Sequence, residues 1–214
     1  MTDASITAEK LLQADAVRLN IKQPYTWASG WKSPIYCDNR KILSHPFIRD
    51  YIKSELANVV FEKYTNAELI AGVATAGIAW GAMVADQLKL PFIYVRPKPK
   101  EHGLGNQIEG GFIQGQSTVV IEDLISTGKS SLQVTEVLKN AGLNVAGMVS
   151  IFNYRFDVAK DALEAAGISV HSLTDYPALV KLAKEMKMIG ETDQEVLLKW
   201  REDPANWKGV SLNS

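Results

Sequence analysis

The feature that most constrains the fold is the run of residues 118–131, TVVIEDLISTGKSS. The β-branched residues 119–121 predict a strand buried on both faces, as the strands of parallel sheets are. Glu122 and Asp123 follow where this strand is expected to end, and a hydroxyl-rich loop then leads into a periodic run typical of a helix. Ligands of open α/β sheets bind outside the carboxyl ends of the strands, beside helix N-termini that bind anions. The segment therefore predicts acids for sugar hydroxyls next to a loop for phosphate, and a phosphorylated ribose fits both.

The same segment has two other interpretations. It ends like an ATP-binding P-loop, but that template requires glycine where this chain has Asp123. A carboxylate there would face the phosphates that the backbone must hold, so we reject the P-loop. A structural interpretation stays open, in which Ser126 and Thr127 cap a helix and the two acids favour its N-terminal dipole.

Length and composition limit the class of protein. The chain has 214 residues, a net charge of -1 and one cysteine, Cys37. The near-neutral charge gives no overall attraction to nucleic acid or to an anionic membrane, and a lone cysteine excludes an intramolecular disulfide. The N-terminus lacks a signal-peptide pattern, and no apolar run approaches the roughly 20 residues that span a bilayer. We therefore expect a cytoplasmic globular protein that binds neither nucleic acid nor membrane.

Strand patterns alternate with helix patterns along most of the chain. Strands are expected at residues 68–73, 91–95, 118–122, 144–152 and 168–173. Helices are expected at residues 7–17, 46–64, 77–89, 130–140, 157–166, 177–188 and 193–201. This alternation predicts an α/β fold with a Rossmann-like parallel sheet that helices flank on both faces.

The chain shows no clean linker or internal repeat, so we expect a single domain over residues 1–214. Residues 1–44 lie outside the alternation and are expected to form a small N-terminal hood on the sheet. Residues 65–175 are expected to form the core sheet, and residues 176–214 the C-terminal helices.

The long connection at residues 96–116 is a second candidate for function. It has five glycines and few large apolar side chains, and it carries the basic residues Arg96, Lys98, Lys100 and His102. Loops of this length in a compact domain are usually functional or disordered. Glycines give mobility and basic groups bind phosphate, so we favour a lid over a solvated surface loop.

Three further segments have both a functional and a structural interpretation. Residues 72–77 join a strand to a helix through small residues, which either admit an anion or allow tight packing. Residues 29–36 combine a turn with aromatic side chains, which either cover a flat ring or pin the N-terminal segment. Arg155 follows a strand, where it either binds a ligand carboxylate or forms a surface ion pair.

Several of these segments together resemble a known family. VVIEDLISTGKSS resembles the phosphoribosyl pyrophosphate motif of type I phosphoribosyltransferases. Within that superfamily, WASGWKSPIYCDNR, the R-x-x-x-K-x-H-G loop and the arginine after the fourth strand are similar to the orotate phosphoribosyltransferases. The resemblance spans residues 27–155. It implies the type I phosphoribosyltransferase fold and transfer of a phosphoribosyl group to orotate, giving orotidine 5'-monophosphate and pyrophosphate in pyrimidine biosynthesis.

The resemblance also implies roles for single residues. Glu122 and Asp123 would bind the ribose hydroxyls, and the loop after them would wrap the 5'-phosphate. The implied phosphoribosyl pyrophosphate contacts of this motif are Glu122, Asp123, Leu124, Ile125, Ser126, Thr127, Gly128, Lys129 and Ser130. Orotate would contact Lys32, Ser126 and Arg155, with Arg155 on its carboxylate.

The implied leaving-group residues are Arg96, Lys100 and His102, in a lid that reaches into the neighbouring subunit of a homodimer. Cations that hold the departing pyrophosphate stabilise its developing charge, and Lys100 or His102 can also give it a proton. Lys100, His102 and Asp123 are the implied catalytic residues. The implied cofactor is Mg²⁺, carried by phosphoribosyl pyrophosphate and not expected to bind any side chain directly.

Three positions depart from the family pattern. Pro97 stands where many relatives have lysine, Thr75 and Ala76 stand where some have Tyr-Lys, and the acid pair is Glu-Asp where others have Asp-Asp. We interpret these as subtype differences, and they leave the roles of Lys98 and Thr75 open.

Two other functions are kept as alternatives. A phosphoribosyltransferase for another base, such as a purine, would need neither Arg155 nor the KSP segment. A regulator that senses phosphoribosyl pyrophosphate or binds nucleic acid usually has a recognition helix or a basic patch, which this sequence lacks.

Overall fold

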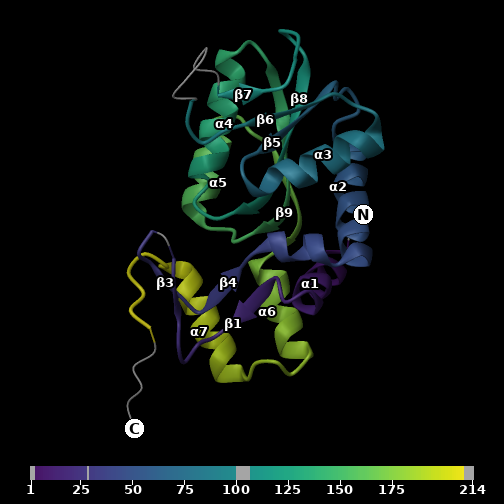
Figure 1. Ribbon diagram of the computed structural model, residues 1–214. Helices are drawn as coiled ribbons and strands as arrows, with labels where there is room; N and C mark the ends of the chain where they lie inside the picture. The colour runs from purple at the N-terminus through teal and green to yellow at the C-terminus, as the bar shows by residue number, and fades with distance from the viewer. Residues whose placement is uncertain (1–2, 28, 100–106, 210–214) are drawn as a thin grey trace.

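The computed structural model describes residues 3–27, 29–99 and 107–209 (Figure 1). A six-stranded sheet with the order β10-β9-β8-β5-β6-β7 forms its centre. The strands are β5 (Leu69–Val73), β6 (Phe92–Val95), β7 (Ile108–Glu109), β8 (Ser117–Ile125), β9 (Asn144–Asn153) and β10 (Val170–Asp175). All neighbours pair in parallel except β7, which pairs antiparallel to β6. The predicted α/β class and parallel sheet are confirmed.

Helices cover both faces of this sheet. The helices α2 (Pro46–Lys63) and α3 (Ala76–Leu88) share one apolar cluster with Val119 and Ile121 of β8. The helices α4 (Lys129–Asn140) and α5 (Asp157–Ala165) share another with Val120. Side chains alternate between the two faces of a strand, so β8 is buried on both, as its β-branched residues predict.

The remaining elements come from the two ends of the chain and lie together beyond one end of the sheet (Figure 1). They are α1 (Ala4–Gln13), β1 (Val17–Leu19), β2 (Tyr25–Thr26), β3 (Lys32–Ser33), β4 (Ile35–Cys37), the 3-10 helix η1 (Asn39–Ser44), α6 (Tyr176–Glu185) and α7 (Glu191–Glu202). β1 pairs with β4 and β2 with β3, both antiparallel. The boundaries expected for a hood, a core and C-terminal helices stay predictions.

The strand order places the ligand-binding edge of the sheet. Numbered along the chain, the five parallel strands lie in the order 5-4-3-1-2, so chain direction across the sheet reverses between β5 and β8. Ligands of such sheets bind outside the carboxyl ends of the strands at this switch point. The predicted phosphate loop follows β8 and the turn at residues 74–75 follows β5, so both lie there.

Three expectations about single elements are wrong. The helix expected at residues 7–17 is α1, which starts earlier because Asp3 caps it through the Ser5 N–H. The strand expected to end at residue 122 continues to Ile125, so Glu122 and Asp123 lie inside β8 rather than after it. The connection expected to be a loop contains the short edge strand β7, which pairs through Ile108 and Glu109.

Two glycines let α3 approach the sheet at the switch point. A Cβ on Gly72 would lie 2.8 Å from the Gly77 carbonyl oxygen, and one on Gly77 would lie 2.6 Å from the Ile121 carbonyl oxygen. Both distances are shorter than any real Cβ contact, so only glycine fits. Tight packing of helix on sheet therefore explains these two glycines, and it brings α3 beside the end of β8.

We predict that Gly77→Ala destabilises the protein by about 1–3 kcal/mol. The added methyl group would clash with the Ile121 carbonyl oxygen, which can move only together with the backbone of β8. Thermal unfolding measures the effect. Gly111→Ala is the matched control, since its Cβ would meet nothing within 4 Å. Equal melting temperatures for Gly77→Ala and the control would show that α3 can separate from β8 without cost.

Candidate active site

β8 extends past its neighbour β5 at the switch point. Its pairing with β5 ends at Ile121, opposite Gly72, whereas its pairing with β9 continues to Ile125, opposite Asn153. Residues 122–125 therefore project beyond β5, and we call them the β8 overhang. Backbone groups on that side of the overhang lack the β5 ladder, so another part of the chain or a ligand must satisfy them.

Glu122, the first residue of the overhang, is only 4% exposed. Its Oε1 accepts a hydrogen bond from the Asp123 backbone N–H at 3.0 Å, and its Oε2 accepts one from the Ser131 hydroxyl at 3.4 Å. Burial, and then the charge of Asp123, raise the pKa of Glu122 well above its ordinary value. The protonated form of the carboxyl group is therefore favoured, and its two hydrogen bonds hold it between β8 and α4.

Asp123 differs from Glu122 in its surroundings. Burial raises its pKa, but a hydrogen bond from the Glu122 carboxyl and the positive charge of Arg40 oppose this shift. Asp123 is also more exposed than Glu122. The two acids, which were predicted to act alike on ribose hydroxyls, thus differ in environment and access, and their contacts with a ribose stay predictions.

Asn39 holds the overhang from the N-terminal segment. It is 1% exposed, and its Nδ2 donates a 2.7 Å hydrogen bond to the Asp123 carbonyl oxygen. Its Oδ1 accepts from the Cys37 thiol at 3.4 Å. Asn39 therefore supplies a hydrogen-bond donor to the overhang where the pairing with β5 has ended. Sequence reasoning missed this residue, because an Asx residue in a turn has no local signal for a partner 84 positions away.

The predicted phosphate loop turns the chain from the overhang into α4. Gly128 has a φ of +75°, which favours glycine, and it is the N-cap of α4. The first N–H groups of a helix have no acceptor within the helix. Lys129 and Ser130 at the start of α4 are exposed, so their backbone N–H groups can bind an anion. Ser126 and Thr127 are half-buried, and fully buried Ile125 can offer only main-chain atoms.

The base of the predicted lid lies against α4. The backbone of Arg96 makes two hydrogen bonds with Gln107. The Arg96 N–H donates to the Gln107 carbonyl at 2.9 Å, and the Arg96 carbonyl accepts from the side-chain Nε2 of Gln107 at 2.8 Å. Its guanidinium lies 3.7 Å from Glu109, and the Pro97 carbonyl accepts from Gln133 of α4. Lys100 and His102, predicted to be catalytic, lie outside the described residues.

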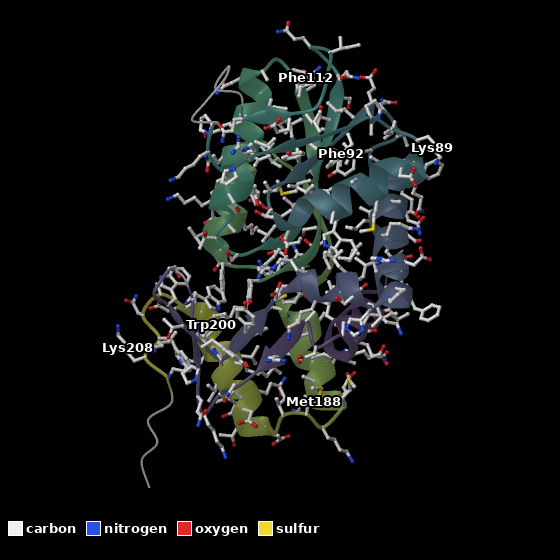
Figure 2. The ribbon with its side chains drawn as sticks, in the orientation of Figure 1. Lys89, Phe92, Phe112, Met188, Trp200 and Lys208 are labelled. Atoms are coloured by element: carbon white, nitrogen blue, oxygen red, sulfur yellow. The ribbon has the colours of Figure 1, made fainter. Side chains whose placement is uncertain are left out.

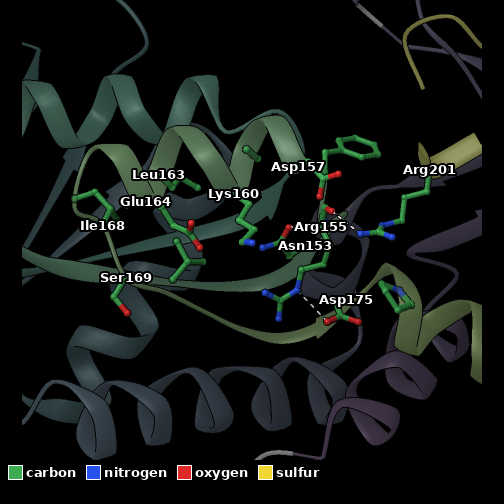
Figure 3. A pocket seen from close by; sticks show the side chains of 14 residues that line it. Asn153, Arg155, Asp157, Lys160, Leu163, Glu164, Ile168, Ser169, Asp175 and Arg201 are labelled. Atoms are coloured by element: carbon green, nitrogen blue, oxygen red, sulfur yellow. Dashed lines mark hydrogen bonds and ion pairs between the residues drawn. The ribbon is translucent and has the colours of Figure 1, made fainter. Parts of the chain in front are cut away.

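The predicted orotate residues Lys32 and Arg155 lie on two different elements. Lys32 is on β3 and donates from Nζ to the Thr26 hydroxyl at 2.8 Å. Arg155 follows β9, and its Nε donates to Asp175 at 3.0 Å (Figure 3). The surface ion pair considered for Arg155 is therefore present, and binding of a ligand carboxylate by Arg155 stays a prediction.

Arg155 also borders a pocket with a volume of about 730 Å³. This pocket lies between α5 and β10 and includes Lys160, Asp175 and Arg201 (Figure 3). None of residues 126–130 lines it, so it extends away from the phosphate loop along the edge of the sheet.

Two negative findings apply to the described residues. No group of three or more His, Cys, Asp or Glu side chains in residues 3–27, 29–99 and 107–209 is arranged to hold a metal ion. In the same ranges, no helix has the length and apolar character needed to cross a membrane.

Comparison with known proteins places the chain in a family. The phosphoribosyl transferase domain family matches residues 38–166. An orotate phosphoribosyltransferase of Phocaeicola vulgatus is 51% identical over 201 residues, which are 94% of this chain and 95% of that protein. One of Bacillus cereus is 51% identical over 199 residues, covering 93% and 95% of the two chains.

The chain belongs to the orotate phosphoribosyltransferase family.

A solved structure of the family agrees with the fold. The orotate phosphoribosyltransferase of Aeropyrum pernix superposes with a TM-score of 0.73 at 28% identity, covering 86% of this chain and 99% of that chain. In this family member, the fold places the overhang, the phosphate loop and the base of the lid at one edge of the sheet.

We predict that Asn39→Leu weakens binding of phosphoribosyl pyrophosphate, because the Asp123 carbonyl loses its donor and the overhang is released. Titration calorimetry should give a Kd about 5–20-fold higher, the size of one lost hydrogen bond in a buried site. Thr174→Val is the control, since it removes a similar 2.7 Å bond to the Ala4 carbonyl, away from the overhang. Equal affinities in the two variants would contradict a role for Asn39.

We predict that Glu122→Gln gains stability over the original protein as pH rises. The pKa of Glu122 is raised in the folded protein, so the unfolded chain releases its proton near 4.5 while the folded chain keeps it. The carboxyl group therefore costs stability above about pH 4.5, and glutamine does not. Melting temperatures at pH 4 and pH 7 should show a larger advantage for glutamine at pH 7. Exposed Glu136→Gln is the control, and equal pH trends in both would contradict a neutral buried Glu122.

Proposed function

We propose that the protein transfers the phosphoribosyl group of phosphoribosyl pyrophosphate to orotate. The products are orotidine 5'-monophosphate and pyrophosphate, in the route to UMP. The observation that carries this proposal is 51% identity to an orotate phosphoribosyltransferase over 94% of the chain. A location in the cytoplasm is part of the same proposal.

Phosphoribosyl pyrophosphate lies across the switch point in this proposal. Asp123, the more exposed acid of the overhang, accepts hydrogen bonds from the ribose hydroxyls, and buried Glu122 supports it from behind. Residues 126–130 wrap the 5'-phosphate with backbone N–H groups and hydroxyls. The Gly128 turn supports this arrangement, because it exposes the first N–H groups of α4 beside the overhang.

Cations stabilise the departing pyrophosphate. As the bond from ribose C1 to pyrophosphate breaks, positive charge develops on the ribose and negative charge on the leaving group. Arg96 holds the leaving group at the base of the lid, and Lys100 and His102 hold and protonate it from the lid. Closure of the lid keeps water from the activated sugar.

Mg²⁺ would neutralise the pyrophosphate charge and arrives with phosphoribosyl pyrophosphate. A Mg²⁺ site built mainly from substrate oxygens fits an overhang with one accessible carboxylate, Asp123, because Mg²⁺ keeps several waters and needs few protein ligands. The protein is proposed to act as a homodimer, in which the lid of one subunit completes the site of the other.

Orotate lies between β3 and the end of β9. Arg155 uses Nε for Asp175, and its terminal nitrogens are proposed to bind the orotate carboxylate as a fork. Lys32 and Ser126 contact the ring. Since orotate is already an anion at neutral pH, its nitrogen needs alignment with ribose C1 more than it needs a strong base.

We predict Mg²⁺-dependent consumption of orotate when the purified protein is mixed with phosphoribosyl pyrophosphate. Loss of orotate absorbance measures the reaction, and chromatography with adenine, guanine, hypoxanthine and uracil tests the base. Use of orotate alone is the expected result. Use of another base would contradict the role of Arg155, and binding of phosphoribosyl pyrophosphate without any turnover would favour a regulator.

A further inference from the structure

Trp200 and Arg201, two neighbouring residues of α7, bind the main chain at two of the proposed orotate residues, Lys32 and Arg155. Trp200 Nε1 donates to the Lys32 carbonyl oxygen at 3.0 Å. Arg201 Nη2 donates to the Arg155 carbonyl oxygen at 2.8 Å (Figure 3). Lys32 and Arg155 are 123 residues apart in the sequence, and α7 belongs to neither of their elements. One turn of helix therefore fixes two separate parts of the same proposed subsite.

Arg155 has an unusual conformation that needs such support. Its φ is +58°, in the left-handed region that non-glycine residues rarely adopt. Its backbone N–H donates to Asn153 Oδ1 at 2.7 Å, its carbonyl accepts from Arg201, and its Nε binds Asp175. The three contacts hold both the backbone and the first part of the side chain, so they set where the guanidinium points.

Trp200 joins α7 to both sides of Arg155. Trp200, labelled in Figure 2, is fully buried. Its ring packs edge-on against Tyr154 at 6.0 Å and Phe156 at 5.6 Å between centroids. It packs in the same way against Trp27 at 5.8 Å, in the N-terminal segment. Edge-to-face pairs at these distances favour one relative orientation, so α7 cannot shift without moving the residues on either side of Arg155.

Part of the Arg201 side chain is buried, at a cost in free energy. Its Nε is inaccessible to solvent and has no hydrogen-bond partner among the described residues. A surface arginine would keep this group in water, so its position is set by the contact with the Arg155 carbonyl rather than by solvation.

We propose that Trp200 and Arg201 are positioning residues that hold the orotate subsite in place through Lys32 and Arg155. This inference rests on the proposed function, because it takes orotate as the ligand of that subsite. Neither residue is assigned a contact with substrate. Their effect passes through two carbonyl groups, so it falls on orotate and not on phosphoribosyl pyrophosphate, whose proposed contacts lie on the overhang, the phosphate loop and the lid.

Steady-state kinetics of three single variants test the proposal. Arg201→Ala should raise the KM for orotate about tenfold, and Trp200→Phe, which keeps the ring and loses the N–H, about 3–5-fold, as expected for one hydrogen bond with and without a charged donor. The KM for phosphoribosyl pyrophosphate should stay within about twofold. Arg201→Lys keeps a donor and should recover most of the orotate affinity.

Tyr176→Phe is the matched control. It removes a buried 2.9 Å hydrogen bond from the Tyr176 hydroxyl to the Leu197 carbonyl, which joins α6 to α7 without touching Lys32 or Arg155. It should lower the melting temperature as Trp200→Phe does and leave the KM for orotate unchanged. An equal rise in that KM for the control would overturn the proposal, because general loosening of α7 would then explain it.

A double-mutant cycle separates positioning from structure. If Arg201 acts through Arg155, Arg201→Ala should add less than twofold to the KM for orotate once Arg155 is already alanine. A full tenfold addition in that background would overturn the proposal, as would equal rises in the KM of both substrates. If the unaltered protein consumes no orotate, the proposed function fails first, and this result is distinct from normal turnover with unaffected variants.

Discussion

The unequal length of two neighbouring strands is the constraint on which the rest of the site depends. β8 keeps its pairing with β9 for four residues after its pairing with β5 has ended, between Ile121 and Ile125. Backbone groups released in this way must find other partners, because buried polar groups without them are costly. The sheet thus creates an edge that recruits polar groups at the switch point, where ligands of this architecture bind.

The partners found at this edge come from all parts of the chain. Asn39 of the N-terminal segment binds the Asp123 carbonyl, Glu122 turns inward to Ser131 of α4, and Gly77 lets α3 approach the Ile121 carbonyl. Each contact removes freedom from the overhang before any ligand binds. The energetic benefit of such preorganisation is that substrate binding does not have to order the site. Asp123 is then the accessible acid of the overhang, where a ribose is proposed to lie.

Much of the fold follows from local sequence patterns, and the exceptions have physical reasons. The β-branched residues 119–121 predict a buried strand, and periodic apolar runs predict the helices. Both signals are local properties of the sequence. The predicted end of β8 was wrong by three residues, because acidic residues are typical of a strand end unless a protein group, such as the Ser131 hydroxyl, donates a hydrogen bond to them. β7 has two residues and no pattern of its own.

Residue identity at the site was more predictable than residue environment. Sequence patterns placed Asp123, Ser126 and Arg155 at the carboxyl edge, but they did not indicate the raised pKa of Glu122, which depends on burial by the whole fold. Asn39, Trp200 and Arg201 act through partners at sequence separations of 84, 168 and 46, which no local pattern can reveal. Their contacts explain how segments from both ends of the chain can support one site.

A crystal structure of the protein with orotidine 5'-monophosphate would test the proposed location of the site most directly. The phosphate should lie against the backbone N–H groups of residues 127–130, with the ribose hydroxyls at Asp123 and the base carboxylate within hydrogen-bond distance of Arg155. A ligand bound instead along the pocket between α5 and β10, with its phosphate away from α4, would contradict an active site built on the β8 overhang.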